Sequence, residues 1–265
     1  MVYSEPLFLI GGDSFVTMEL GDDGSLHLNL YILVLEKMIN AAKFPWFIDT
    51  TSMRTTIVVH FDPFAIQAEQ VIAELKELIS GGVHIPEIVV SKLIHLPVYY
   101  NDPLTRECAK NYNLPPNLEL IASDNNISID EVISIHTRPR YFVSYICFTY
   151  GSFGAFPLDP SPVLKNSKYK SPRKWTPPGT LGIGGTTTFF YSISSSGGLM
   201  MLGSIPCPTV DSEGRNRFFK DDPLLVRPGN VLKFFPIDRD EYGYIKAHAV
   251  DYTYRIEETQ IRWKE

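Results

Sequence analysis

Strand and helix patterns of apolar residues alternate along the first part of the chain. Runs typical of strands cover residues 7–10, 15–20, 47–51, 55–61 and 87–94. Two helical stripes separate them, with Leu28, Ile32, Leu35 and Ile39 in the first and Ala68, Ile72, Leu75 and Ile79 in the second. The order ββαββαβ predicts an open α/β sandwich, with helices on one face of a mainly antiparallel sheet.

The second helical stripe carries its own boundary signals. Asp62-Pro63 predicts the start of the helix, with aspartate as the cap and proline at the first helical position. Gly81-Gly82 predicts its end, because glycine commonly terminates helices. We therefore expect one helix that starts at Pro63 and ends at Ser80.

The pattern changes after this first domain, and four segments are predicted. Residues 1–95 form the α/β sandwich domain, and residues 96–139 form a helical bridge in which Ser128 to Glu131 is a capping box. Residues 140–240 show strand patterns broken by Gly and Pro, which predicts a β-barrel or sandwich domain. Residues 241–265 form a tail that adds a strand or packs across the barrel. The predicted fold class is therefore α+β.

The stretch from Ser171 to Gly203 contains two glycine pairs around a strand pattern. The pairs flank residues 186–193, which are almost all β-branched, aromatic or hydroxylated, and this predicts a strand with glycine at both corners. Glycine curves a barrel sheet, and it also lets a ligand approach the backbone closely. Both interpretations stay open. Under the second, the candidate substrate-binding residues are Gly184, Gly185, Thr186, Gly197 and Gly198.

The densest group of basic residues precedes these glycines. Arg173 and Lys174 follow three nearby lysines, Lys165, Lys168 and Lys170. A guanidinium pairs with a carboxylate in a fork, so Arg173 is the candidate for holding a substrate carboxylate. A solvated loop is the alternative interpretation of this basic segment.

Three further residues are secondary candidates. His136 precedes two arginines, one of them Arg140, so it is a candidate for orienting a carboxylate with them or for carrying a proton. A cap at the helix C-terminus is the plainer interpretation of His136. Asp159 lies between prolines, where it is a candidate general base or, more commonly for this residue, closes a turn.

Composition and missing motifs exclude several functional classes. The 265 residues carry a formal net charge of −6 with no dense Lys/Arg stripe, so a nucleic-acid partner is not expected. The three cysteines are widely spaced, and no P-loop, H-E-x-x-H or G-x-S-x-G motif occurs. We therefore expect no metal site. The chain shows no secretory signal and no apolar run near the roughly 20 residues that cross a bilayer, so we expect a cytoplasmic protein without a membrane partner.

A series of short landmarks occurs in one order along the chain. They are Gly12-Asp-Ser14, His60-Phe-Asp-Pro63, Leu96-Pro-Val-Tyr-Tyr100, Arg140-Tyr-Phe-Val143, Ser171 to Gly179, Leu181 to Gly185, Arg227-Pro-Gly229 and Lys233-Phe-Phe-Pro236. In this order they resemble subdomains C and D of the carboxyltransferase domain shared by urea carboxylase, the B-type subunit of 5-oxoprolinase and the sporulation-kinase inhibitor KipI. This family also carries the label allophanate hydrolase subunit 1. The resemblance covers roughly residues 5 to 240.

The resemblance implies a cyclophilin-like β-barrel after the α/β domain, and a shared active site. The chain would be one half of a urea carboxylase-like, biotin-dependent carboxyltransferase or of an ATP-dependent 5-oxoprolinase-like amidohydrolase, acting on a small amide or urea-like substrate. The second half would be a homologous subunit of the subdomain A and B type, such as KipA or the C-type subunit of 5-oxoprolinase. Because no Met-Lys-Met biotin-acceptor tripeptide occurs, we expect no cofactor on this chain. Biotin and ATP would belong to partners, among them a biotin carboxylase or a biotin carrier chain.

Some positions depart from the pattern of the resembling proteins. Where those usually have Ser-Pro-Gly-Gly-Tyr/Trp-Gln, this chain has Gly198 followed by Leu199 and Met200. The alternative hypothesis is therefore a non-catalytic, KipI-like module that inhibits a histidine kinase or binds another partner, because methionine-rich surfaces suit adaptable binding. No catalytic residue is assigned, and we do not expect the chain to be active alone.

Overall fold

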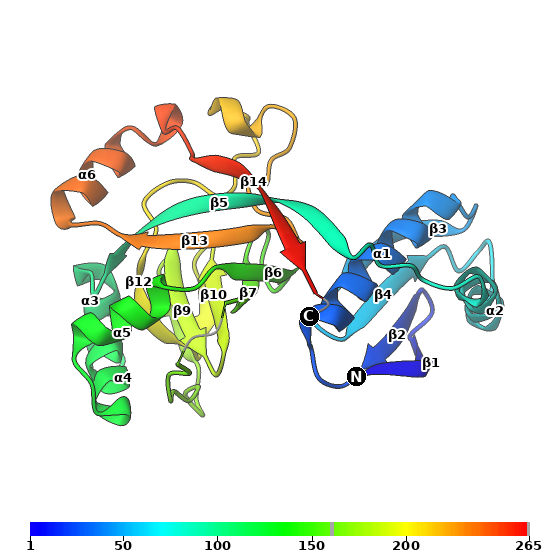
Figure 1. Ribbon diagram of the computed structural model, residues 1–265, viewed down its shortest axis with the longest axis horizontal. Coiled ribbons are helices and arrows are strands. Elements are labelled where there is room, and N and C mark those ends of the chain that lie inside the picture. The colour runs from blue at the N-terminus through cyan, green and yellow to red at the C-terminus, as the bar shows by residue number, and fades with distance from the viewer. Residues whose placement is uncertain (160–161, 264–265) are drawn as a thin grey trace. The chain divides into compact units, whose positions relative to one another are not determined.

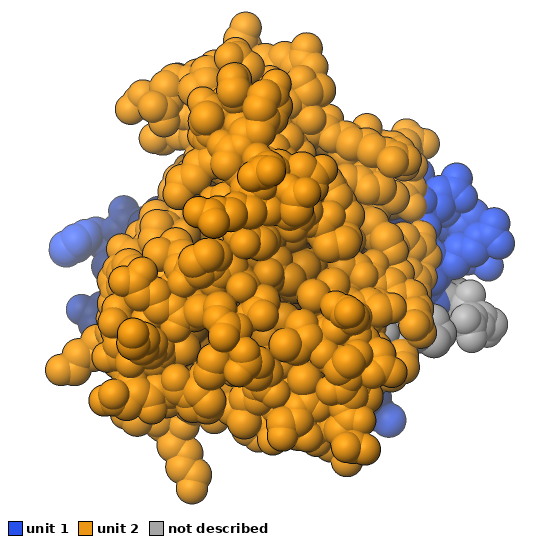
Figure 2. Space-filling model, turned by 90° about the vertical axis from the view of Figure 1, so that its left-hand side faces the viewer, with its two compact units in different colours: residues 1–90, 260–265 blue, residues 91–259 orange. Residues whose placement is uncertain are grey.

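Two units, each with its own apolar core, make up this computed structural model, which describes residues 1–159 and 162–263. The first unit comprises residues 1–90 and the chain from Gln260, and the second comprises residues 91–259. They are coloured separately in Figure 2. Among the helices of the described ranges, none combines the length and apolarity needed to cross a bilayer.

The first unit is a four-stranded antiparallel sheet with two helices packed on one face (Figure 1). Its strands are ordered β1-β2-β4-β3. Alternate residues of β2, Val16, Met18 and Leu20, are buried against the helices, as the period of two requires. The elements in chain order are β1 (Val2–Gly11), β2 (Phe15–Gly21), α1 (Leu26–Ala42), β3 (Phe47–Ser52), β4 (Thr56–Phe61) and α2 (Ala68–Ser80).

The predicted start of the second helix is wrong by one turn and more. α2 begins at Ala68, and the side chain of Gln70 accepts a hydrogen bond from the backbone N–H of Gln67 at 3.2 Å. Asp62 instead closes a turn, because its carboxylate accepts from the N–H of Phe64 at 2.9 Å and its carbonyl accepts from Ala65 at 3.1 Å. Asp62 therefore accepts hydrogen bonds from the following backbone as a capping residue would, but the segment it caps is a turn and not the helix.

The second unit is a β-barrel with helices packed against it. Its first elements are β5 (Ile88–Tyr100), α3 (Pro103–Asn111), α4 (Asn117–Asn125), α5 (Ile129–Thr137), β6 (Tyr141–Ile146), β7 (Phe153–Pro157) and β8 (Arg173–Thr176). They continue with β9 (Thr180–Gly184), β10 (Thr187–Tyr191), β11 (Ser195–Gly197), β12 (Met200–Ser204), η1 (Arg217–Phe219), β13 (Val231–Pro236), α6 (Arg239–Ala247), η2 (Ala249–Asp251) and β14 (Ile256–Arg262). The α3 and α4 helices lie beside β12, and α5 lies beside β13.

Seven strands close the barrel in the order β12-β9-β10-β7-β6-β13-β5. The ring closes because β12 also pairs with β5, through Gly203 opposite Tyr100 and Ser204 opposite Tyr99. β14 lies next to β5 as an eighth strand, while β8 and β11 form a separate two-stranded ribbon. The predicted α+β class, an α/β sandwich followed by a β-barrel, is confirmed. One strand differs from the prediction. β5, the last strand of the predicted ββαββαβ order, belongs to the barrel sheet and not to the sheet of the first unit.

The glycine-rich hairpin is confirmed at one corner only. Gly185 turns the chain between β9 and β10 with a φ of +62°, a left-handed conformation that favours glycine. At the other end, β10 stops at Tyr191, before the second glycine pair. Gly197 instead lies in β11 opposite Arg173 of β8. The second pair therefore joins the ribbon to β12 and is not a corner of β10.

The barrel interior holds a fully buried histidine. His136, in the last turn of α5, is 1% exposed, and its ring stacks on Phe234 with centroids 5.2 Å apart. Its Nδ1 lies 2.7 Å from the Tyr100 hydroxyl, and its Nε2 lies 3.0 Å from Oγ1 of Thr188. Burial lowers the pKa of His136 to about 3, so the ring is neutral at pH 7. It ties α5 to β5 and β10.

The seam between β12 and β5 generates a first prediction. A Cβ at Gly203 would lie 2.3 Å from the carbonyl oxygen of Tyr99. We therefore expect Gly203→Ala to lower the free energy of unfolding by about 1–3 kcal/mol, measured by chemical denaturation, since the two backbones must separate. Gly243→Ala in α6 is the control, because apart from its neighbours in the chain and the backbone of its own helix no atom lies within 4 Å of the added Cβ. The control should be neutral or stabilising by up to about 1 kcal/mol, and equal losses would contradict the seam argument.

The buried histidine predicts a pH dependence. Because the pKa of His136 in the folded protein is about 3, below the usual 6.5, the unfolded chain takes up a proton first as the pH falls. The contribution of His136 to the free energy of unfolding should have its full value above about pH 6.5. Between about pH 6.5 and about pH 3 the free energy of unfolding should fall by up to about 1.4 kcal/mol per pH unit. Urea midpoints across this range should lose that slope in His136→Gln. The exposed His84 supplies the control His84→Gln, and the same slope in both variants would refute the assignment.

Candidate functional site

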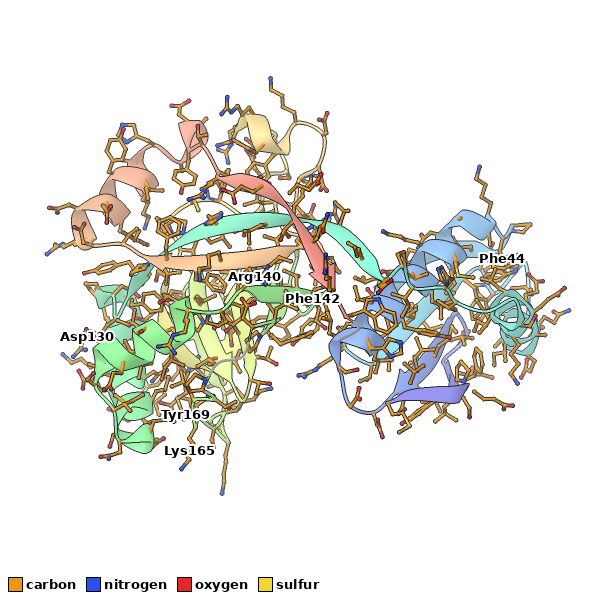
Figure 3. All side chains as sticks on the ribbon, viewed as in Figure 1. Phe44, Asp130, Arg140, Phe142, Lys165 and Tyr169 are labelled. Carbon is orange, nitrogen blue, oxygen red and sulfur yellow. The ribbon has the colours of Figure 1, made fainter. Side chains whose placement is uncertain are left out.

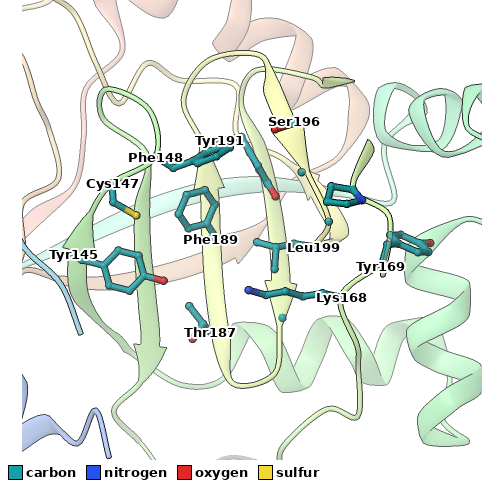
Figure 4. A pocket seen from close by; sticks show the side chains of 14 residues that line it. Tyr145, Cys147, Phe148, Lys168, Tyr169, Thr187, Phe189, Tyr191, Ser196 and Leu199 are labelled. Atoms are coloured by element: carbon teal, nitrogen blue, oxygen red, sulfur yellow. The ribbon is translucent and has the colours of Figure 1, made fainter. Parts of the chain in front are cut away.

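A cavity of about 430 Å³ opens on the outer side of the barrel between β10 and the β8–β11 ribbon (Figure 4). Thr187, Phe189 and Tyr191 line it from β10, because alternate residues of a strand face the same side. Tyr145 of β6 and Phe148 of the following loop also line it. This cavity is the candidate functional site.

Two glycines let side chains lie directly on the backbone in this cavity. A Cβ at Gly184 would lie 2.4 Å from Cδ2 of Leu199 and 3.2 Å from Cε of Lys168. A Cβ at Gly197 would lie 2.6 Å from the Tyr191 hydroxyl. At both positions a Cβ would fit only if a neighbouring side chain moved, and both glycines line the cavity. Gly184 and Gly197 thus have a packing role and also line the cavity, so neither the structural nor the ligand-binding interpretation of the glycine-rich stretch is excluded.

The structure brings some of the predicted substrate-binding residues together and separates others. Gly184, Gly197 and Gly198 line the same cavity. Gly185 and Thr186 line a different and much smaller one, of about 40 Å³, together with His136. The substrate-binding role of all five residues stays a prediction. Of these five, only Gly184, Gly197 and Gly198 line the candidate functional site.

Arg173 lies buried beneath the cavity wall and is not one of the lining residues. Its side chain is 1% exposed, and Nη2 donates a hydrogen bond to the carbonyl oxygen of Leu199 at 2.9 Å. Its Nε and Nη1 have no hydrogen-bond partner among the described residues. Burial lowers the pKa of Arg173, but a guanidinium remains protonated at neutral pH. An unbalanced positive charge therefore lies under the glycine wall.

Lys168 supplies the cationic group that lines the cavity itself. Its stem lies over Gly184, and in Figure 4 its amine points toward the side formed by Tyr145 and Thr187. Lys168 belongs to the basic segment of the sequence, where no local pattern distinguishes it from the neighbouring lysines. Phe189 and Tyr191 also line the cavity, and the period of two along β10 is the sequence signal that puts them on one face.

Arg140 and Asp159 form an ion pair outside the cavity. Nη2 and Nε of Arg140 lie 2.7 and 3.0 Å from the two carboxylate oxygens of Asp159, and the Arg140 backbone N–H donates to the same carboxylate at 2.8 Å. The arginine lowers the pKa of Asp159, and the carboxylate raises the pKa of Arg140. The pair joins the start of β6 to the segment after β7. Figure 3 labels Arg140 there, and Lys165 and Tyr169 in the segment before β8.

Comparison with known proteins identifies relatives along most of the chain. Residues 6–219 match the family described as carboxyltransferase domain, subdomain C and D. The chain is 26% identical over 266 residues to urea amidolyase of Saccharomyces cerevisiae, covering 92% of this chain and 14% of that protein. It is 27% identical over 249 residues to the B-type subunit of 5-oxoprolinase from Bacillus subtilis, covering 90% of this chain and 95% of that subunit. The chain thus spans a small part of the first relative and nearly all of the second.

Solved structures show the same fold. Urea amidolyase of K. lactis superposes with a TM-score of 0.89 at 22% identity, over 98% of this chain and 17% of that one. Urea carboxylase of Kluyveromyces lactis gives a TM-score of 0.88 at 22% identity, over 98% of this chain and 25% of that one. Because the family match extends over most of its length, the chain belongs to the carboxyltransferase domain family, subdomains C and D, as the resemblance of its landmarks predicted.

Proposed function

We propose that this chain supplies one half of a carboxyltransferase-type active site and works with a second homologous subunit on an amide or urea-like nitrogen. The observation that carries the proposal is family membership over residues 6–219. The relatives support a shared site, because one is named as a subunit and another is a protein of which this chain matches only 14%. The partner we propose is a subdomain A and B half, similar to KipA or to the C-type subunit of 5-oxoprolinase.

The cavity provides what such a half-site needs. Transfer of a carboxyl group requires a carboxylate and an amide to be held close together. It also benefits from positively charged groups that are already in position to stabilise the negative charge of the transition state. Lys168 at the cavity and Arg173 beneath it carry positive charge, and Gly184 lets the Lys168 stem lie directly against the wall. We propose that this chain binds and orients the substrate. Biotin or ATP, with a biotin carboxylase or carrier chain, would come from partners in the same compartment, for which the cytoplasm remains our prediction.

The alternative of a KipI-like binding module loses its main support. A binding module of this kind needs an adaptable apolar surface at Leu199 and Met200, and a second methionine, Met201, follows them. The structure buries Met200 and Met201, which are 4% and 2% exposed. Met200 packs in the barrel core, and Met201 packs against Cys108 and Ala109 of α3. Since neither methionine is available to a partner, we place the half-site first.

Reconstitution tests the half-site. Co-expression with a homologous second half should give a stable complex, and substrate turnover should require both chains. Within that complex, Arg173→Met should lower kcat by at least about tenfold, because it removes a preorganised charge near the reacting groups. Methionine is uncharged but similar in length to arginine, so the side chain should still fill the buried position.

The matched control is Arg239→Met, at an exposed position in α6. It should leave turnover unchanged. If the Arg173→Met complex turns over like the parent, Arg173 is not the anion-holding charge. If no second half binds at all, the half-site proposal fails and the binding module returns.

A further inference from the structure

The cavity is larger than a substrate of urea's size requires. At about 430 Å³ it falls within the roughly 300–1,000 Å³ typical of sites for larger organic ligands. Leu199, whose side chain lies over Gly184, is one of its lining residues.

The walls of the cavity are aromatic. Rings of Tyr145, Phe148, Phe189 and Tyr191 line it, and Phe189 and Tyr191 meet edge to face, with centroids 5.1 Å apart and planes at 74°. Such an arrangement offers faces and edges to a further flat ring. Aromatic walls alone suit a neutral ring or a cation, so the charge of the site decides between ligand classes.

That charge is positive. None of the lining residues, all within the described part of the chain, is acidic, and Lys168 is the charged one. Arg173 adds a second positive charge beneath the wall, with two guanidinium nitrogens left without hydrogen-bond partners among the described residues. A cationic ligand would be repelled, whereas a carboxylate would be attracted.

The mouth of the cavity carries an exposed ring on strained backbone. Phe148 is 63% exposed and has a φ of +73°, which is rare for a bulky residue. Hydrogen bonds hold its loop, from the N–H of Thr149 to the Cys147 carbonyl at 2.9 Å and from the Ser192 hydroxyl to the Tyr150 carbonyl at 2.6 Å. Strain of this kind persists where the surroundings impose it, and it clusters at ligand sites.

We infer that the cavity binds a carboxylate with a flat apolar body, most simply an aromatic acid. The ring lies among Tyr145, Phe148 and Phe189, and the carboxylate faces the ammonium group of Lys168. The inference deepens the proposed function and rests on it for the claim that this ligand is the substrate. The amide that the half-site receives is then one carried on such a body and not urea itself.

Ligand-detected NMR on the purified full chain tests this without any partner. The probes are benzoate, its neutral amide benzamide, its cationic counterpart benzylamine, and urea. We expect saturation transfer to benzoate with millimolar affinity, weaker transfer to benzamide, and none to benzylamine or urea. Benzylamine binding as tightly as benzoate, or urea displacing benzoate, would overturn the inference.

Three variants locate the bound acid. Lys168→Met should weaken benzoate binding about tenfold, because it removes a charge-assisted contact. Lys170→Met is the matched control, since Lys170 is an exposed lysine of the same segment outside the cavity lining, and it should bind like the parent. Phe189→Leu should weaken binding by up to about tenfold through loss of the ring contact. Parent-like binding in both Lys168→Met and Phe189→Leu would refute the site.

The two proposals fail separately. Benzoate binding to this chain with no turnover in any reconstituted complex would sink the half-site and leave the ligand class standing. Turnover of urea in the complex, with no benzoate binding, would do the reverse.

Discussion

The barrel depends on a close backbone contact where β12 meets β5. Gly203 has no side chain, so the β12 backbone reaches the carbonyl of Tyr99 and completes the ring of strands. The same β12 pairs on its other side with β9, which ends at Gly184. It also begins just after Leu199, whose side chain lies over Gly184. Closing the barrel therefore also sets the glycine wall of the cavity.

Charge under that wall is the second constraint. A guanidinium that is buried with two unpaired nitrogens costs stability, because its lost hydration is only partly replaced. Proteins retain such unfavourable features mainly at functional sites. Arg173 is buried and donates to the Leu199 carbonyl, whereas Lys168 is exposed and its stem lies over Gly184. Together they place positive charge at the cavity, and this charge links the proposed reaction to the proposed ligand.

Local signals succeeded where the neighbouring sequence contains all the partners. Ser128 and Glu131 form the predicted capping box of α5. Asp102 caps α3 in a similar local way, through the N–H groups of Leu104 and Thr105. The Asp62-Pro63 signal failed, because the same aspartate chemistry closes a turn as readily as it opens a helix. The prediction that the second glycine pair forms a corner of β10 was wrong, because Gly197 lies in β11 and pairs with Arg173 of β8. This pairing depends on tertiary contacts and not on the local sequence.

The sequence by itself determined the α+β class, the family and the candidate glycines, since periodicity, caps and ordered landmarks are local properties. Only the tertiary structure decided which candidates meet. It buried Arg173, laid Lys168 on Gly184 and paired Arg140 with Asp159, a pairing the sequence analysis did not foresee. It also gathered the aromatic walls from β6, β10 and the loop that carries Phe148. These contacts join residues far apart in the chain, and strand pairing and barrel closure, which no short segment encodes, bring them together.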